Sequence, residues 1–443
     1  MSFGDIRVAE RADWLIERVA TAGTLVLRRL GESRAGEKAI HRFLSSPYVS
    51  VERIVETLAS RTAVQCAGRR VLAVQDTTEV NFAGRDKKRR GFGPGGDGAT
   101  PAFFIHPVFA IDVESEAVMG LVDAEIWTRS TRRVSAHRSR AIEDKESARW
   151  LSGCRAAASV LSEAGEVTMV SDRESDMYLL FARKPQRLDL IVRAAQDRSL
   201  ADGEKLFQAL SGTPPLSRSE VRVAPRGPGD KGRVASVELR ATSVRIARPQ
   251  GMPRSEEAPQ AIELSLVEVR EIDAPPGKKP LLWRLLTTRP VTCALQAEAV
   301  VQLYRLRWRI EQVFRALKSD GLALDDSQVI DAERMFNLAA IGLAGAIRTI
   351  QLVDARDGGP RPATDVIDAA FGVALQRLSA RLEGKTLRQK NPHPPNSLAF
   401  VSWIAARLGG WNCYYKPPGP KTMRQGWTRL AATLDGYALA VQY

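Results

Sequence analysis

Cysteine and histidine are scarce in this sequence. Its 443 residues include four cysteines and four histidines, and their scattered positions match neither a disulfide framework nor a zinc site. Long hydrophobic runs are also missing: no run of 18 apolar residues occurs, and residues 1–5 lack the apolar core of a secretory signal. We therefore expect a cytoplasmic protein without structural disulfides or zinc.

Acidic residues are outnumbered. The 65 Lys and Arg residues against 51 Asp and Glu residues give a net charge of +14 and a pI near 9.9. An excess of this size favours a polyanionic partner, most often nucleic acid, although it does not separate DNA from RNA and a merely basic protein is the alternative. The length indicates two or three domains, and 44% apolar with 26% charged residues is typical of globular proteins.

Two short apolar runs each end in a carboxylate. Residues 69–75 lead directly into Asp76, and residues 167–171 lead directly into Asp172. A carboxylate that follows a buried strand lies at the strand's carboxyl end, where open α/β sheets place their ligands. An aspartate in a strand-terminating turn is a common alternative. Asp76 and Asp172 are therefore candidate site residues, each with a structural alternative.

The segment 303–318 has the apolar periodicity of a helix. We expect this helix to begin with Thr292 as its N-cap and to stop before Gly321. One continuous apolar stripe would face the core, and polar residues would line its border. That border carries Tyr304, Arg307, Glu311 and Lys318. A salt-bridged surface ladder is the alternative, since Arg307, Glu311 and Arg315 are spaced four residues apart.

The spacing of these four residues resembles a known signature. Tyr, two residues, Arg, three residues, Glu, six residues and Lys is the pattern of bacterial DDE transposases of the transposon-five type, in the insertion-sequence-four group. The contexts Asp76-Thr77-Thr78 and Asp172-Arg173-Glu174-Ser175-Asp176 also resemble those of the family's two catalytic aspartates. We expect Asp176 to cap or orient its neighbours and not to bind metal.

The resemblance implies site residues and a cofactor. It assigns catalysis and metal binding to Asp76, Asp172 and Glu311, which would hold two Mg²⁺ ions, with Mn²⁺ as a substitute. It assigns DNA contacts to Tyr304, Arg307, Lys318, Trp283 and Arg193. Trp283 lies 21 residues before Tyr304, the placement of the family's base-stacking tryptophan. A tryptophan buried in a core strand is the alternative for Trp283.

The expected fold is α/β, with an RNase H-like core of mixed sheet and flanking helices. Between residues 200 and 290, runs of alternating polarity separated by Pro and Gly clusters predict an antiparallel β insertion. Helices are expected at 140–165, 332–353 and 363–382, and a basic loop at 84–98. The expected regions are 1–65, helical and DNA-end-binding; 66–199, the first part of the core; 200–290, the insertion; 291–355, the second part of the core; and 356–443, helical and dimerising.

The two ends of the chain have expected partners. Residues 1–65 are basic and helical and resemble the family's region that grips the transposon end, although a small subdomain packing on the core is equally open. Residues 397–443 carry more apolar side chains than two short helices need to bury, which favours pairing of two subunits. The alternative is that these side chains pack on the preceding helices.

These features lead to an expected activity. The resemblance implies a cut-and-paste transposase of the bacterial nucleoid, which cuts double-stranded DNA at transposon ends through a hairpin intermediate and joins the ends to target DNA as a homodimer. An RNase H-like nuclease that cuts without joining is one alternative. A non-catalytic DNA-binding descendant is the other.

Overall fold

The structure is a computed structural model that describes residues 5–82, 89–130, 145–223, 232–253, 256–318 and 321–441. The chain divides into two compact units. The first unit contains residues 1–66, 77–133 and 309–443, and the second contains residues 67–76 and 134–308. Residues 84–88 of the expected basic loop and 140–144 of the expected helix lie outside the described residues.

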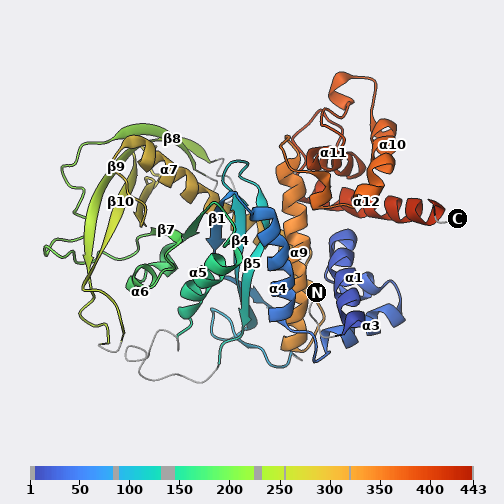
Figure 1. Ribbon diagram of the computed structural model, residues 1–443, viewed down its shortest axis with the longest axis horizontal. Coiled ribbons are helices and arrows are strands. Elements are labelled where there is room, and N and C mark those ends of the chain that lie inside the picture. The colour runs from blue at the N-terminus through green and yellow to red at the C-terminus, as the bar shows by residue number, and fades with distance from the viewer. Residues whose placement is uncertain are drawn as a thin grey trace. The chain divides into compact units, whose positions relative to one another are not determined.

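In the part of the chain that the structure describes, the second unit contains seven strands of a mixed sheet. Their order is β1 (Arg70–Gln75), β6 (Glu166–Ser171), β7 (Leu188–Arg193), β11 (Leu282–Thr287), β10 (Ala261–Glu271), β9 (Arg233–Ala247) and β8 (Ser217–Val223). The first three strands run parallel, and every later pairing is antiparallel. The long strands β9 and β10 and their neighbour β8 form the curved ribbon visible in Figure 1. The predicted antiparallel insertion is confirmed, and β11 joins it to β7.

Apolar burial fixes the parallel strands. Residues 71–75 of β1 and 167–171 of β6 are all buried, as expected for strands covered on both faces. Helix α5 (Ala148–Val160) packs against β1 and β6, and the Gln75 side-chain amide donates to the Trp150 carbonyl at 3.2 Å. The expected helix at 140–165 is therefore shorter: within the described residues it begins at Ala148, and it ends at Val160, before the turn that enters β6.

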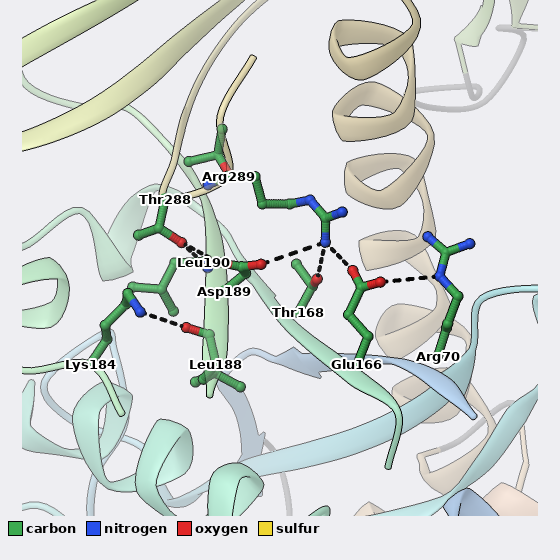
Figure 2. A network of polar contacts seen from close by, with 10 residues as sticks. Arg70, Glu166, Thr168, Lys184, Leu188, Asp189, Leu190, Thr288 and Arg289 are labelled. Carbon is green, nitrogen blue, oxygen red and sulfur yellow. Dashed lines mark hydrogen bonds and ion pairs between the residues drawn. The ribbon is translucent and has the colours of Figure 1, made fainter. Parts of the chain in front are cut away.

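A polar network joins the amino-terminal ends of β1 and β6 to β7 and the end of β11 (Figure 2). Glu166 accepts from Arg70 at 3.2 Å and also pairs with Arg289. Arg289 in turn donates to the Thr168 hydroxyl at 3.1 Å and lies 3.6 Å from the Asp189 carboxylate. Because its contacts span β1, β6, β7 and the end of β11, the network stabilises the register of this part of the sheet.

The predicted helix at 292–318 is interrupted. The structure has α7 (Ala294–Arg305), a 3₁₀ turn η3 (Leu306–Trp308) and α8 (Arg309–Leu317). Cys293, not Thr292, stands at the N-cap position; the Thr292 hydroxyl donates to the Gln296 side chain. The apolar stripe is buried as predicted, whereas the expectation of one continuous helix was wrong. The 3₁₀ turn advances each residue further around the axis than an α-helix does.

The first unit combines helices with a small antiparallel sheet. Its sheet contains β2 (Thr78–Asn81), β3 (Gly93–Pro94), β4 (Pro101–Asp112) and β5 (Val118–Trp127), all paired through β4. Its N-terminal helices are α1 (Ile6–Ala22), α2 (Leu27–Gly31), α3 (Arg34–Leu44) and α4 (Val51–Cys66). The helical prediction for residues 1–65 is thus confirmed, and the 3₁₀ turn η4 (Leu324–Asp326) follows α8.

Helix α9 (Ala332–Ala355) is the central helix of the first unit. It contacts α1, α4, α8, α11, α12 and β5. Among the described residues it is the one helix long and apolar enough to cross a membrane, but 78% of its apolar window is buried inside the structure. Core helices pass the same length and composition test, so α9 is accounted for by packing.

The C-terminal apolar residues are buried within the chain. Helices α11 (Leu398–Leu408) and α12 (Pro420–Val441) pack on each other and on α9, and a Cβ on Gly426 would lie 1.6 Å from the Ala405 carbonyl oxygen. One buried cluster includes Phe400, Trp403, Ile404, Trp427, Leu430 and Leu434, with Leu408 and Trp411 partly buried against it. The expectation that these residues form surplus surface for pairing was wrong, because the preceding helices cover them.

The expected helix at 363–382 is also broken. It consists of η5 (Ala363–Asp365), η6 (Ala369–Phe371) and α10 (Gly372–Leu382). Asp368 caps η6 by accepting from the Ala370 amide at 2.8 Å, and an Asp or Ser in that role offers the backbone an alternative to a continuous helix.

The Glu166 network predicts a pH dependence of stability. Burial raises the pKa of Glu166, but its bonds to Arg289 and Arg70 outweigh burial and lower the pKa below its usual 4.5. A carboxyl with a lowered pKa stabilises the fold above its unfolded pKa, and this contribution disappears as the pH falls through the folded pKa. We expect Glu166→Gln to cost about 1 kcal/mol at neutral pH, after allowing for solvent screening.

Urea unfolding of wild type and Glu166→Gln between neutral pH and pH near 3 checks this expectation. The two proteins should converge in stability as the pH falls below about 4.5. Glu163→Gln, a change at an exposed carboxylate close by, is the matched control. A constant difference between wild type and Glu166→Gln at every pH would contradict the role given to this ion pair.

Candidate nucleic-acid and metal site

Two of the predicted carboxylates lie side by side in the second unit. In every residue pair between β1 and β6 the numbers differ by 96, for example Val74 with Val170. Asp76 and Asp172 also differ by 96, and each is the first residue after its strand. Neighbouring strands lie about 4.8 Å apart. The parallel register therefore brings the two carboxylates to the same edge of the sheet, next to each other.

The same register continues to Arg193. In the residue pairs between β6 and β7 the residue numbers differ by 21, and the numbers of Asp172 and Arg193 differ by the same amount. Arg193 ends β7, and its guanidinium donates to the Leu282 carbonyl at 3.1 Å. Asp76, Asp172 and Arg193 thus form one row across three strands, with two carboxylates followed by a cation.

Asp176 holds the chain that follows this row. Its buried carboxylate accepts from the backbone amides of Ala195 and Gln196 at 2.8 and 3.0 Å and pairs with Arg198 at 2.8 Å. This agrees with the expectation that Asp176 orients its neighbours. It fixes the segment leaving β7, and so the end of the strand that carries Arg193.

The Asp76 carboxylate is neutralised by Arg307. The Arg307 Nη1 atom donates to Asp76 Oδ2 at 2.8 Å, and both side chains are about 15% exposed. Arg307 lies in η3, so the 3₁₀ turn carries this guanidinium to the end of β1. Asp172 accepts from the Glu174 amide at 2.9 Å and caps the short turn η2 (Arg173–Ser175).

Tyr304 contacts Trp283 and has cationic neighbours. The ring centroids of Tyr304 and Trp283 are 5.3 Å apart at an interplanar angle of 66°, an edge-to-face contact. Arg193 and Arg307 are the positively charged neighbours that act on the Tyr304 hydroxyl. Burial raises the pKa of Tyr304, and the neighbouring Arg307 and Arg193 only partly oppose that rise, so its hydroxyl stays protonated at neutral pH and is able to donate. Trp283 lies in β11 and is half-buried.

A basic cavity adjoins this group. It measures about 360 Å³ and is lined by Arg173, Arg193, Lys279, Pro280, Leu281 and Leu282. Burial lowers the pKa of Arg193, and the positive charges of Arg173 and Arg307 lower it further, while Tyr304 acts in the opposite direction. Partly buried cations that repel one another are stabilised by a bound anion. The sequence did not single out Arg173 or Lys279, since each stands in a turn with no periodic pattern around it.

The remaining two predicted residues belong to the first unit. Glu311 lies in the first turn of α8 and is partly buried. Lys318 follows α8 directly, and its ammonium donates to the Thr78 hydroxyl and to the Glu79 carbonyl, both at 2.6 Å. Burial lowers the pKa of Lys318, opposed by Asp325 and Glu79. Lys318 therefore anchors β2 in this structure, a structural role that the sequence did not indicate.

The donor chemistry fits a hard cation. Aspartate oxygens are the ligands that Mg²⁺ prefers, and it is commonly held by one or two protein carboxylates together with substrate phosphates and water. Asp76 and Asp172 supply such a pair. Among the residues that the structure describes, however, no group of three or more His, Cys, Asp or Glu side chains is arranged to hold a metal.

Comparison with known families adds one finding. Residues 128–346 match the family model described as the transposase DDE domain. The matched segment is just under half of the chain; it includes Asp172 and Glu311, and Asp76 precedes it. The match supports a DDE transposase, an enzyme class that acts on DNA.

The contacts of Lys318 predict a loss of stability on its removal. Lys318→Met should cost about 1.5–3 kcal/mol, because two hydrogen bonds from a charged donor are lost and their acceptors are left in a partly buried site. Chemical denaturation measures the change. Arg305→Met, at an exposed position near the end of α7, is the control and should change stability by less than about 0.5 kcal/mol. Equal effects of the two substitutions would refute the anchoring role.

Proposed function

We propose that this protein is a cut-and-paste DNA transposase of the transposon-five type with an RNase H-like core. The observation that carries the proposal is the row of Asp76, Asp172 and Arg193 at the ends of three parallel strands. Tyr304 and Arg307 flank that row, and the matched DDE domain covers the segment that contains Asp172 and Glu311. This combination suits recognition and hydrolysis of a phosphodiester.

In the proposed site Asp76, Asp172 and Glu311 would hold two Mg²⁺ ions. Bound Mg²⁺ would lower the pKa of an attacking water and stabilise the charge on the leaving oxygen. Water attacks phosphorus, and the bond between phosphorus and the 3′ oxygen breaks, which leaves a 3′-hydroxyl and a 5′-phosphate. The 3′-hydroxyl then attacks a phosphorus atom on the other strand to close a hairpin, which water reopens, and finally attacks target DNA. Each step exchanges one phosphoester bond, so no redox partner is needed.

The surrounding cations have separate proposed roles. Arg307 and Arg193 bind phosphate oxygens, where a planar guanidinium forms paired hydrogen bonds. Tyr304 donates its protonated hydroxyl to the same backbone. Lys318 is proposed as a point charge towards DNA in addition to its contacts with β2. Trp283 stacks on an extruded base, a contact worth about 1–3 kcal/mol.

The larger organisation also remains a proposal. Residues 1–65 grip the transposon end, residues 200–290 form the insertion, and the core is completed by 66–199 and 291–355. Two subunits pair in the complex that holds both ends, since cutting before pairing would leave broken DNA. The buried C-terminal cluster no longer argues for residues 356–443 as the pairing contact, so the pairing surface is left open.

Two alternative functions each differ from a transposase in one measurable outcome. A nuclease with this core would cut transposon ends without joining them to a target. A non-catalytic descendant would bind DNA without cutting it; the presence of all three carboxylates Asp76, Asp172 and Glu311 argues against that alternative.

Loss of any one proposed metal ligand should abolish cutting. We expect Asp76→Ala, Asp172→Ala and Glu311→Ala each to reduce strand cleavage at least about 100-fold, since hydrolysis depends on the metal ligands. Binding to end DNA, measured by gel shift, should stay within a few-fold of wild type. Glu174→Ala removes an exposed carboxylate two residues from Asp172 and is the control. Near-normal cleavage by one of the three variants would remove that residue from the set.

Trp283 is expected to act after the first cut. Trp283→Ala should bind end DNA nearly normally but form and resolve hairpins poorly, because stacking matters once a base has left the duplex. Trp283→Phe retains a π face and should restore most of the hairpin product. A destabilised Trp283→Ala protein with an unchanged yield of hairpin would support a packing role for this side chain instead.

A further inference from the structure

The C-terminal part of the first unit has an unusual charge composition. Residues 384–434 contain eight Lys and Arg residues and no Asp or Glu. The nearest acid on the N-terminal side, Glu383, pairs with Lys390 at 3.1 Å. The net positive charge of this segment is therefore not offset within it.

Two loops of this segment are fastened together. The first contains η7 (Leu387–Gln389), and the second spans residues 411–419. Arg407 donates to the Leu382 carbonyl at 2.9 Å, ahead of the first loop, and to the Trp411 carbonyl at 2.8 Å in the second. The Thr386 and Tyr414 hydroxyls are 2.7 Å apart, which joins the loops directly. The loops thus form one platform supported by the buried C-terminal cluster.

The exposed side of the platform mixes cations with large apolar groups. Leu387 is 92% exposed and Tyr415 is 81% exposed. Exposed cations on the same loops, and on the start of α12, include Lys385, Arg388, Lys416 and Lys421. We call these six residues the C-terminal basic surface. Large apolar side chains that are exposed in a group mark interaction sites more often than single exposed apolar residues do.

We infer that the C-terminal basic surface binds nucleic acid, with a preference for strands that carry unpaired bases. Lysine and arginine contact phosphates without regard to sequence, and an exposed tyrosine offers a face on which a base stacks. The choice of nucleic acid over another polyanion rests on the proposed function. The surface itself lies wholly in the first unit and has no part in the proposed cleavage chemistry.

The direct test is DNA binding by the full chain in EDTA, where no metal-dependent cutting occurs. Fluorescence anisotropy would follow a labelled single-stranded oligonucleotide of random sequence, and its duplex, across a salt titration. Arg388→Ala/Lys416→Ala removes one cation from each loop. Its slope of log affinity against log salt should be shallower by about 1.4 for the single strand, at about 0.7 per phosphate contact.

A second variant separates stacking from charge. Tyr415→Ala should weaken binding of the single strand about 5-fold or more while leaving duplex binding unchanged, since paired bases are not available for stacking. Arg155→Ala/Arg187→Ala removes the same charge from exposed positions of the second unit and is the matched control. All three variants change exposed side chains, and circular dichroism verifies that each is folded.

The outcomes are distinct from those of the cleavage experiments. If Arg388→Ala/Lys416→Ala and Tyr415→Ala had the same salt slope and affinity as the control variant, the inference would be overturned, whether or not wild type cuts DNA. Loss of binding to phosphatidylserine vesicles with unchanged DNA binding would overturn it in favour of a lipid surface. Weakened DNA binding in a protein that never cuts transposon ends would support the surface and contradict only the proposed function.

Discussion

The parallel pairing of β1, β6 and β7 is the constraint on which the candidate site depends. Parallel strands have equivalent ends on one edge of the sheet, so side chains that follow them meet without any further device. The constant register places Asp76 beside Asp172 and Asp172 beside Arg193. The network of Glu166 and Arg289 at the opposite strand ends holds that register. A shift of one residue would separate the carboxylates and turn their side chains to opposite faces.

Charge balance at this edge suits a substrate that is itself an anion. The negative charge of Asp76 is balanced by its ion pair with Arg307. Arg193, Arg173 and Lys279 line a basic cavity. Two carboxylates without cations would repel DNA, and cations without carboxylates would bind DNA but supply no metal ligand. Neighbouring groups of both signs allow a metal ion and a phosphate to be held together. The matched DDE domain is consistent with that chemistry.

Patterns close in sequence predicted the local structure well. The strands that precede Asp76 and Asp172, the β insertion and the stripe from Leu303 to Leu317 follow from apolar periodicity. Features set by distant contacts were missed. The 3₁₀ turn at Leu306–Trp308 has no recognisable sequence signal. The C-terminal cluster is buried by the preceding helices, which the apolar pattern gave only as the alternative to pairing. Lys318 binds β2, some 240 residues away in sequence, which no spacing rule anticipates.

The most direct measurement of the central claim is strand transfer. Purified protein would be incubated with labelled, uncut transposon-end DNA, Mg²⁺ and a supercoiled target plasmid, and both cleavage of the ends and covalent attachment of the label to the plasmid would be measured. A transposase predicts labelled plasmid with wild type and Mg²⁺, and none with Asp172→Ala or with EDTA. Cut but unattached ends would indicate a nuclease. Bound ends with neither cutting nor joining in the presence of Mg²⁺ would contradict an enzymatic role for the row formed by Asp76, Asp172 and Arg193.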